Sequence, residues 1–259
     1  MRSALTLLFL SLLCTCARAQ LLDQEGTYGE DWGGYLYGFK GGLSLGNQDW
    51  TGLETELLLG YHADLYYETI PSQGRFSFFG QAGVHTRGSR ISRRRGFTFN
   101  GLGVTLPADD FRFTNLSLAI GAKSVFAYTR FGDAYYLLGL RADYSVGNNL
   151  GEYDQLENSV GVAFRLNYPF DQPDFINELT YGAIFGVGTH FPVADKIGGF
   201  VEVSGSPDFS FQYNQPPLDN IIDPFGGPPR TIGQRMIRNF TIEVSFGIRF
   251  LRRYEYIDK

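Results

Sequence analysis

The stretch that decides the fold is NFTIEVSFGIRFL, residues 239–251. Its even-numbered residues, from Phe240 to Phe250, are all apolar, and the residues between them are polar or glycine. Successive side chains of a β-strand point to opposite faces, so the alternation predicts one long strand with an apolar face and a polar face. Strands of globular proteins are usually about 5–6 residues long, so a strand of this length is typical of a different class of β protein.

The same alternation recurs along most of the chain. It predicts seven further strands, at residues 34–46, 53–68, 74–87, 111–126, 134–146, 178–191 and 200–213. In the last of these, Phe209 and Tyr213 fall on the apolar face. We therefore expect an all-β fold, an eight-stranded antiparallel up-and-down transmembrane β-barrel with long outer loops. The alternative is a soluble lipocalin-like barrel or sandwich, in which the apolar faces point inward.

Glycine and charge favour the membrane barrel over the soluble alternative. The chain has 33 glycines in 259 residues, and many fall on the polar face beside charged residues, as the narrow interior of a small barrel requires. Aromatic residues make up 16% and charged residues only 19% of the chain, which argues against disorder. The net charge of -5 gives no basic footprint for nucleic acid, so no nucleic-acid partner is expected.

Residues 1–19 have the pattern of a secretory signal peptide. Arg2 is followed by an apolar run, and Ala17-Arg18-Ala19 fits the cleavage site. An N-terminal membrane anchor or a lipoprotein at Cys14 or Cys16 are the alternatives. We expect an N-terminal periplasmic segment at 20–32, the barrel at 33–251 and a periplasmic C-terminal tail at 252–259, in the outer membrane of a Gram-negative bacterium.

The predicted connections alternate in length. Residues 69–73, 127–133 and 192–199 are short, whereas 88–110, 147–177 and 214–238 are long; the first connection, 47–52, is also short but falls on the long-loop side by parity. Outer-membrane barrels have short periplasmic turns and longer extracellular loops, so both termini are expected in the periplasm. The β-like segment 159–168 is assigned to the long loop that contains it, because a ninth spanning strand would break this parity.

Several segments carry a family resemblance: YGFKGGLS at 37–44, FTNLSL at 113–118, GLRADY at 139–144, and residues 181–192 and 237–253. They resemble strands of small outer-membrane β-barrel proteins of the PorT-like and OmpA-like barrel group. The resemblance implies the barrel architecture, and one branch of the group implies a role in protein secretion across the outer membrane.

The polar faces predict a charge network inside the barrel. The lumen residues expected to form it are Lys40, Glu54, Glu56, Asp64, Arg75, Arg87, Lys123, Arg141, Asp143, Glu202, Asp208, Glu243 and Arg249. An eight-stranded barrel is just wide enough for side chains to fill, and a buried charge is tolerated only when it is paired. We therefore expect a plug of ion pairs, with a proton or ion path as the alternative.

The histidines point inward by the same parity. His62, His85 and His190 are expected to be spread along the barrel, whereas a metal site needs ligands that converge. No P-loop, zinc motif or serine-hydrolase elbow occurs. We expect no cofactor, no metal and no catalytic residue.

An outer loop offers the clearest candidate surface. Arg90, Arg93, Arg94 and Arg95 fall in 88–110 and could hold phosphates of lipopolysaccharide, because arginine donates paired hydrogen bonds to phosphate. We expect a monomeric, non-enzymatic barrel that contacts outer-membrane lipid and lipopolysaccharide and binds an envelope protein partner through loops 88–110 and 214–238. The alternatives are a component of a secretion apparatus and a lipid-modifying membrane enzyme.

Overall fold

The computed structural model describes residues 32–50, 55–70, 76–91, 95–97, 103–105, 109–129, 132–149, 173–194, 196–221 and 230–255. Eight long strands lie within these ranges: β1 (Trp32–Trp50), β3 (Leu58–Thr69), β4 (Phe76–Ile91), β7 (Asp109–Thr129), β8 (Gly132–Asn148), β9 (Leu179–Ala194), β10 (Ile197–Pro207) and β14 (Arg235–Glu255). Each of the eight predicted strands has its counterpart among them.

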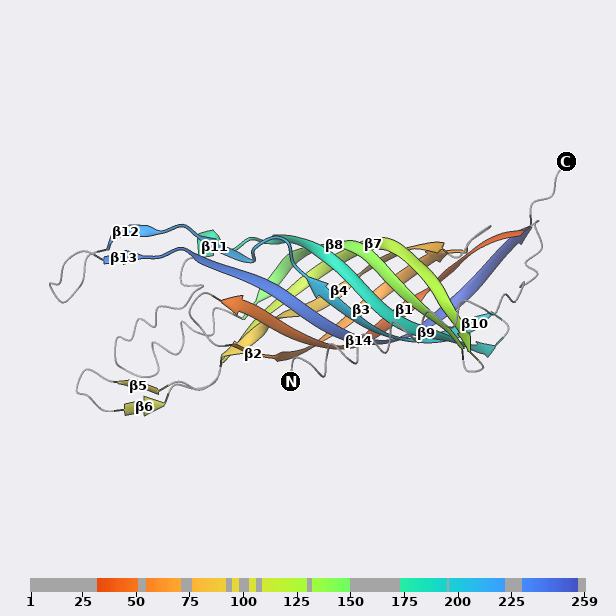
Figure 1. The fold of residues 1–259 in the computed structure, drawn as a ribbon, viewed down its shortest axis with the longest axis horizontal. Coiled ribbons are helices and arrows are strands. Elements are labelled where there is room, and N and C mark those ends of the chain that lie inside the picture. The colour runs from red at the N-terminus through yellow and green to blue at the C-terminus, as the bar shows by residue number, and fades with distance from the viewer. Residues whose placement is uncertain are drawn as a thin grey trace.

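The long strands close into a barrel. They follow one another around the sheet in chain order, and β14 pairs with β1 to complete the ring (Figure 1). This closing pair is antiparallel and unbroken in register, from Trp32 opposite Glu255 to Trp50 opposite Ile237. Closure leaves the barrel wall without an edge strand. The predicted eight-stranded antiparallel up-and-down barrel is confirmed.

Side chains alternate between the interior and the outer surface. Along β3 every second residue is buried, and those between are exposed. The charged residues of this strand belong to the buried set and the exposed set is apolar: Asp64 is 3% exposed, whereas the next residue, Leu65, is 72% exposed. The pattern is the reverse of a soluble domain, in which large apolar side chains fill the core.

The prediction of one continuous strand at 53–68 is wrong near its beginning, at Leu57. The chain forms the short strand β2 (Thr55–Glu56), leaves the strand conformation at Leu57 and resumes as β3. Glu56 and Leu57 are both exposed, so the alternation does not continue through the break. The physical reason is pairing, because β2 bonds to the end of β4 near Arg90, whereas β3 bonds to β1 and β4 within the wall.

The strand predicted at 200–213 is also shorter than expected. β10 ends at Pro207, and the chain bends before the short strand β11 (Tyr213–Gln215), which pairs with the start of β14. The bend changes the parity, so Tyr213 is buried instead of lying on the outer apolar face. Phe209 remains exposed.

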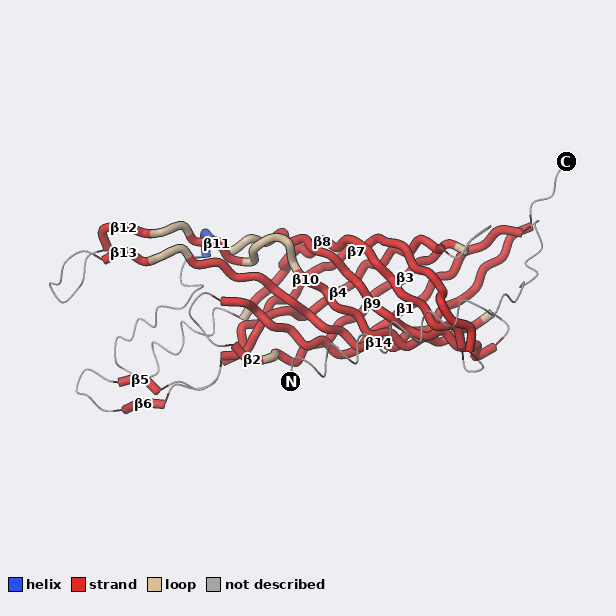
Figure 2. The backbone as a smooth tube through the Cα atoms, in the orientation of Figure 1, coloured by secondary structure: helices blue, strands red, loops and turns tan. Residues whose placement is uncertain are grey.

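The two ends of the barrel differ. Two small ribbons, β5 (Arg95–Phe97) with β6 (Gly103–Thr105) and β12 (Leu218–Ile221) with β13 (Arg230–Ile232), extend beyond one end. The last residues of β14, and the strand ends that the short connections join, lie at the other end (Figures 1 and 2). We call them the long-loop end and the short-turn end. The 3-10 turn η2 (Pro173–Phe175) lies near β11, against Tyr213.

The predicted boundaries need an adjustment at each end, because β1 already begins at Trp32, the last residue of the predicted periplasmic segment 20–32. β14 continues to Glu255, so part of the expected tail at 252–259 is strand paired with β1. The signal peptide at 1–19, the segment 20–31 and the β-like residues 159–168 lie outside the described residues. Among the residues that are described, no helix is long and apolar enough to cross a membrane.

Candidate functional site

An aromatic cluster closes the interior at the long-loop end. Trp50, Phe111, Phe113, Tyr213 and Ile237 pack together, and Phe175 and Ile176 cover them. The rings of Trp50 and Phe111 lie 4.8 Å apart, centroid to centroid. These residues come from β1, β7, β11 and β14, so the cluster crosses the mouth from several sides. We refer to it as the aromatic seal.

A charged cluster lies below the seal, built around His85 and Arg87 of β4. The two ring nitrogens of His85 lie 2.8 Å from Asp64 Oδ1 and 2.7 Å from Glu243 Oε1. An ionised carboxylate only accepts hydrogen bonds, so two ionised partners require a proton on both ring nitrogens. Arg87 Nε lies 2.8 Å from Asp143 Oδ2, and its side chain is fully buried.

Arg141 extends this central cluster across the barrel. Its Nε lies 3.0 Å from Asp143 Oδ2, and its Nη2 pairs with Asp208. Asn239 donates to Asp208 over 2.9 Å, and Gln48 donates to Asn239 over 2.8 Å. Residues from β1, β4, β8, β14 and the end of β10 are thus joined through one buried polar network, which ties the barrel walls together.

Two histidines meet in the central cluster, which corrects the expectation that all three are spread along the barrel. His62 lies opposite His85 in the β3–β4 register, and their rings stack with centroids 5.4 Å apart. The Nε2 of His62 lies 2.8 Å from Ser245 Oγ. Sequence parity placed both rings inside, but only the strand register brings them together. Neither side chain reaches solvent.

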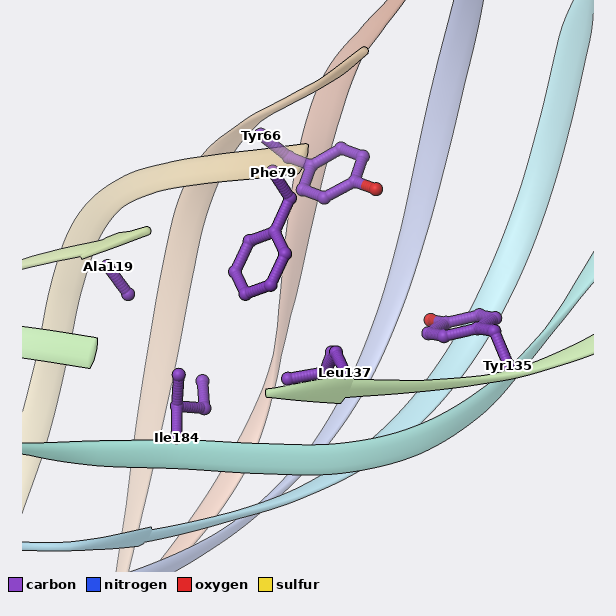
Figure 3. Packing of buried hydrophobic residues seen from close by; sticks show 6 residues of the cluster. All are labelled: Tyr66, Phe79, Ala119, Tyr135, Leu137 and Ile184. Carbon is purple, nitrogen blue, oxygen red and sulfur yellow. The ribbon is translucent and has the colours of Figure 1, made fainter. Parts of the chain in front are cut away.

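An apolar layer also packs inside the barrel, beside the charged groups. Its members are Tyr66, Phe79, Ala119, Tyr135, Leu137 and Ile184. Figure 3 shows these side chains converging from facing walls of the barrel. Sequence reasoning missed this layer because it treated the inward faces as purely polar, although apolar residues at inward positions, such as Phe79 and Leu137, carry the signal.

A second set of charges borders this layer, and its Lys40 lies opposite Asp64 of the central cluster in the β1–β3 register. Lys40 Nζ lies 2.7 Å from Glu202 Oε1, and the Tyr135 hydroxyl donates to the other carboxylate oxygen over 2.8 Å. Lys123 Nζ lies 3.2 Å from Glu68 Oε2 and 4.2 Å from the centre of the Tyr135 ring. Such contacts with a carboxylate and an aromatic face stabilise a buried ammonium group. We call this set the lower charge cluster.

The predicted lumen residues have the following places. Ten are inside and mostly buried: Lys40, Asp64, Arg87, Lys123, Arg141, Asp143, Glu202, Asp208, Glu243 and, half-buried, Arg249. Glu56 was expected inside but is exposed, because the strand is interrupted at Leu57. Glu54 and Arg75 lie outside the described residues. Glu68 belongs to the lower charge cluster and was left out of the prediction, although its alternation with Leu65 and Tyr67 already placed it inside.

The arginine-rich loop is described only in part. Arg90 is exposed and lies 3.3 Å from Asp110, which also contacts Arg112 at 3.3 Å. Arg95 lies in β5, and its side chain is outside the described residues, as are Arg93 and Arg94. The described ends of this loop therefore form a small charge cluster of Arg90, Asp110 and Arg112 on the rim of the barrel.

The packed side chains in the centre of the barrel leave little space for a substrate. His62 and Ser245 resemble a base beside a hydroxyl, but both are buried between the aromatic seal and the apolar layer. Among the described residues, no group of three His, Cys, Asp or Glu is placed to hold a metal ion. The central cluster therefore joins strands, with no described path for a substrate.

Comparison with known proteins gives a similarity of architecture. No protein-family model and no curated protein sequence matches the chain. Among solved structures, it is similar to Neisserial surface protein A (11% identity, 83% of this chain and 96% of that chain, TM-score 0.41). It is also similar to OprG from Pseudomonas aeruginosa (10%, 86% and 98%, 0.45) and to Ail of Yersinia pestis (14%, 86% and 100%, 0.37). Since these TM-scores lie below 0.5, the fold assignment rests on the strand pairing of this chain itself.

Proposed function

We propose that this chain is an outer-membrane β-barrel that conducts no solutes and holds binding loops at the cell surface, without enzymatic activity. The observation that carries the proposal is the inversion of polarity, with apolar side chains outside and paired charges inside a closed barrel. The position in the outer membrane, the absence of catalysis and the binding role are all parts of this proposal.

The outer surface supports a position in the bilayer. Large apolar side chains are exposed on every one of the eight strands, including Phe39, Leu65, Phe78, Ile120, Leu140, Val187, Val203 and Phe246. Soluble monomers rarely expose contiguous apolar patches larger than a few hundred Å². A closed barrel also satisfies its backbone hydrogen bonds within the wall, as spanning a bilayer requires.

The filled interior supports a role without conduction. An open pore needs a continuous aqueous lumen, whereas this interior is filled by the aromatic seal, the apolar layer and the two charge clusters. Eight strands leave just enough width for such side chains. A solute would have to break several buried ion pairs to pass.

The long-loop end supports a binding role. The β5–β6 and β12–β13 ribbons extend beyond the barrel on the same side (Figure 2). Loops held by a rigid barrel are common positions for binding residues. An envelope protein partner or a lipopolysaccharide headgroup would meet these ribbons first.

The test combines conduction with loop replacement. In planar bilayers the purified protein is expected to give no stable porin-sized steps, and reproducible large steps would contradict the proposal. Replacing residues 92–108 and 216–234 by short turns should abolish capture of envelope components while heat-modifiable migration in detergent gels shows an intact barrel. Unchanged capture after replacement of both loops would refute the binding role.

Further measurements distinguish the binding role from a secretion role and from a lipid-modifying enzyme. Membership of the PorT-like group remains a prediction from the sequence, and a secretion role predicts that the intact barrel co-purifies with a stable protein complex. A lipid-modifying enzyme predicts a changed lipid A mass in a deletion strain. An unchanged lipid A mass, with capture that depends on the loops, supports the non-enzymatic binding role.

A further inference from the structure

The strands that close the barrel, β1 and β14, extend past their neighbours at the short-turn end. β3 ends opposite Tyr35 of β1, and β10 begins opposite Phe250 of β14. The β1–β14 pair continues beyond both points, as far as Trp32 opposite Glu255 (Figure 1). We call this pair the closing seam. Its outer face at this end is a surface that the proposed binding loops, at the opposite end, do not use.

Aromatic side chains gather on this outer face. Tyr37 of β1 lies between Tyr67 of β3 and Phe250 of β14 in the strand register. The ring centroids of Tyr35 and Tyr67 lie 5.5 Å apart, and those of Tyr37 and Phe250 lie 5.6 Å apart. Phe39 continues the group, 6.5 Å from Phe250. We call these five residues the seam patch. In a membrane protein, such rings favour the boundary between acyl chains and headgroups.

Two exposed cations lie at the edge of the seam patch. Arg252 follows Phe250 by two residues, so it lies on the same outer face of β14, opposite Tyr35. Lys196 is held beside this strand, because the Leu251 N–H donates to the Lys196 carbonyl over 2.9 Å. Lys196 also lines a cavity of about 370 Å³ inside the mouth. Both cationic side chains are exposed, and neither has an ion-pair partner among the described residues.

The exposed arginines at the long-loop rim differ, because each has a partner. Arg90 and Arg112 both contact the carboxylate of Asp110 at 3.3 Å. Arg238 lies over an aromatic ring, with its guanidinium carbon 4.2 Å from the centre of Phe211. Among the exposed basic side chains in the described ranges, only the two at the short-turn rim lack such a partner.

The chemistry of the short-turn rim matches an anionic phospholipid. A guanidinium group donates paired hydrogen bonds to a phosphate. A second positive charge beside it favours a headgroup with a net negative charge over a zwitterionic one, since a zwitterionic headgroup brings its own ammonium group. The aromatic surface next to these charges matches an acyl chain.

We propose that the closing seam binds an anionic phospholipid of the periplasmic leaflet. Arg252 binds the phosphate at the rim, Lys196 supplies the second positive charge, and the acyl chains pack against Tyr37 and Phe39. This assignment rests on the proposed position in the outer membrane, with the short-turn end toward the periplasm. It adds a lipid partner on the side opposite the loops.

The experiment uses the full barrel, labelled for nuclear magnetic resonance, in phosphatidylcholine nanodiscs. A small fraction of the lipid carries a nitroxide on its acyl chain, either as phosphatidylglycerol or as phosphatidylcholine. The measured quantity is the ratio of amide broadening by the two labelled lipids, which cancels the depth of each amide. We expect this ratio at Tyr37 and Phe250 to be at least about fivefold that at Leu140, on the opposite side of the ring, because one basic residue near a membrane surface attracts an anionic lipid by about that factor.

Charge variants make the result specific. Arg252→Gln and Lys196→Gln should each lower the ratio at Tyr37 several-fold. Arg238→Gln is the matched control, because it removes an exposed arginine from the other end of the same strand, and it should leave the ratio unchanged. Unaltered amide spectra away from the seam establish that each variant folds.

Three results would overturn the assignment. They are equal ratios at Tyr37 and Leu140, a ratio at Tyr37 that favours phosphatidylcholine, and an unchanged ratio in both Arg252→Gln and Lys196→Gln. In each of these cases both labelled lipids still broaden Leu140. Failure of the proposed membrane position would instead leave Leu140 unbroadened by either lipid, so the two failures are distinguishable.

Discussion

The ion pair between Lys40 and Glu202 offers the sharpest test of the filled interior. Both side chains are 1% exposed, and their charged atoms lie 2.7 Å apart. Lys40→Met removes the ammonium group and leaves Glu202 buried, with the Tyr135 hydroxyl as its remaining hydrogen-bond donor among the described residues. Removing one partner of a buried ion pair typically costs about 3–5 kcal/mol, because the other charge stays desolvated. We expect a loss of unfolding free energy of that size.

The assay is reversible urea unfolding in lipid vesicles, followed by tryptophan fluorescence. Glu202→Gln alone should also destabilise the barrel, whereas Lys40→Met with Glu202→Gln should recover most of the loss, since no unpaired charge remains. The control is Arg90→Met, because the Arg90–Asp110 pair is 3.3 Å long with side chains 50% and 34% exposed, and such surface pairs contribute about 0–1 kcal/mol. Equal small losses for Lys40→Met and Arg90→Met would refute the dry, paired lumen.

Two further predictions concern the wall and the turns. Leu65→Arg places a charge on the lipid-facing surface, where Leu65 is 72% exposed, and should cost about 2–4 kcal/mol in vesicles; the loss should shrink for Leu65→Ala, and equal losses would argue against a lipid-facing position. Gly132→Ala should destabilise the barrel by about 1–3 kcal/mol, because φ is +153° and the new Cβ meets the His190 carbonyl. Gly80→Ala, where a Cβ meets nothing within 4 Å, should be neutral in the same unfolding assay, and a loss there as large as at Gly132 would show that the turn geometry is not the cause.

Much of the candidate site followed from alternation alone. Once a strand is assigned, its period of two decides which side chains enter the interior. The sequence therefore correctly predicted the buried positions of Lys40, Arg87 and Glu243. The predictions failed where the strand itself was interrupted. The strand is interrupted at Leu57, directly after Glu56, and the bend after Pro207 reverses the parity of Tyr213. Such breaks depend on which neighbour each segment pairs with, and no local pattern records that choice.

The sequence also could not predict which inward side chains contact one another inside the barrel. His85 contacts Asp64 from the neighbouring strand and Glu243 from a strand 158 residues away in the chain. The relative shift of the strands around the barrel decides which inward residues share a level, and this shift is a property of the closed ring. The same shift stacks His62 on His85 and leaves His190 alone among the three, near Arg249 at the other end.

The sequence by itself determined the strand number, the antiparallel order and the polarity of each face, because these depend on local periodicity and on the lengths of the connections. Only the tertiary structure decided how the interior is divided into a seal, two charge clusters and an apolar layer, and that a cavity remains at one mouth. The physical reason is that a buried charge or ring is stabilised by whichever groups lie at its own level, and those groups are set by long-range register rather than by neighbours in the chain.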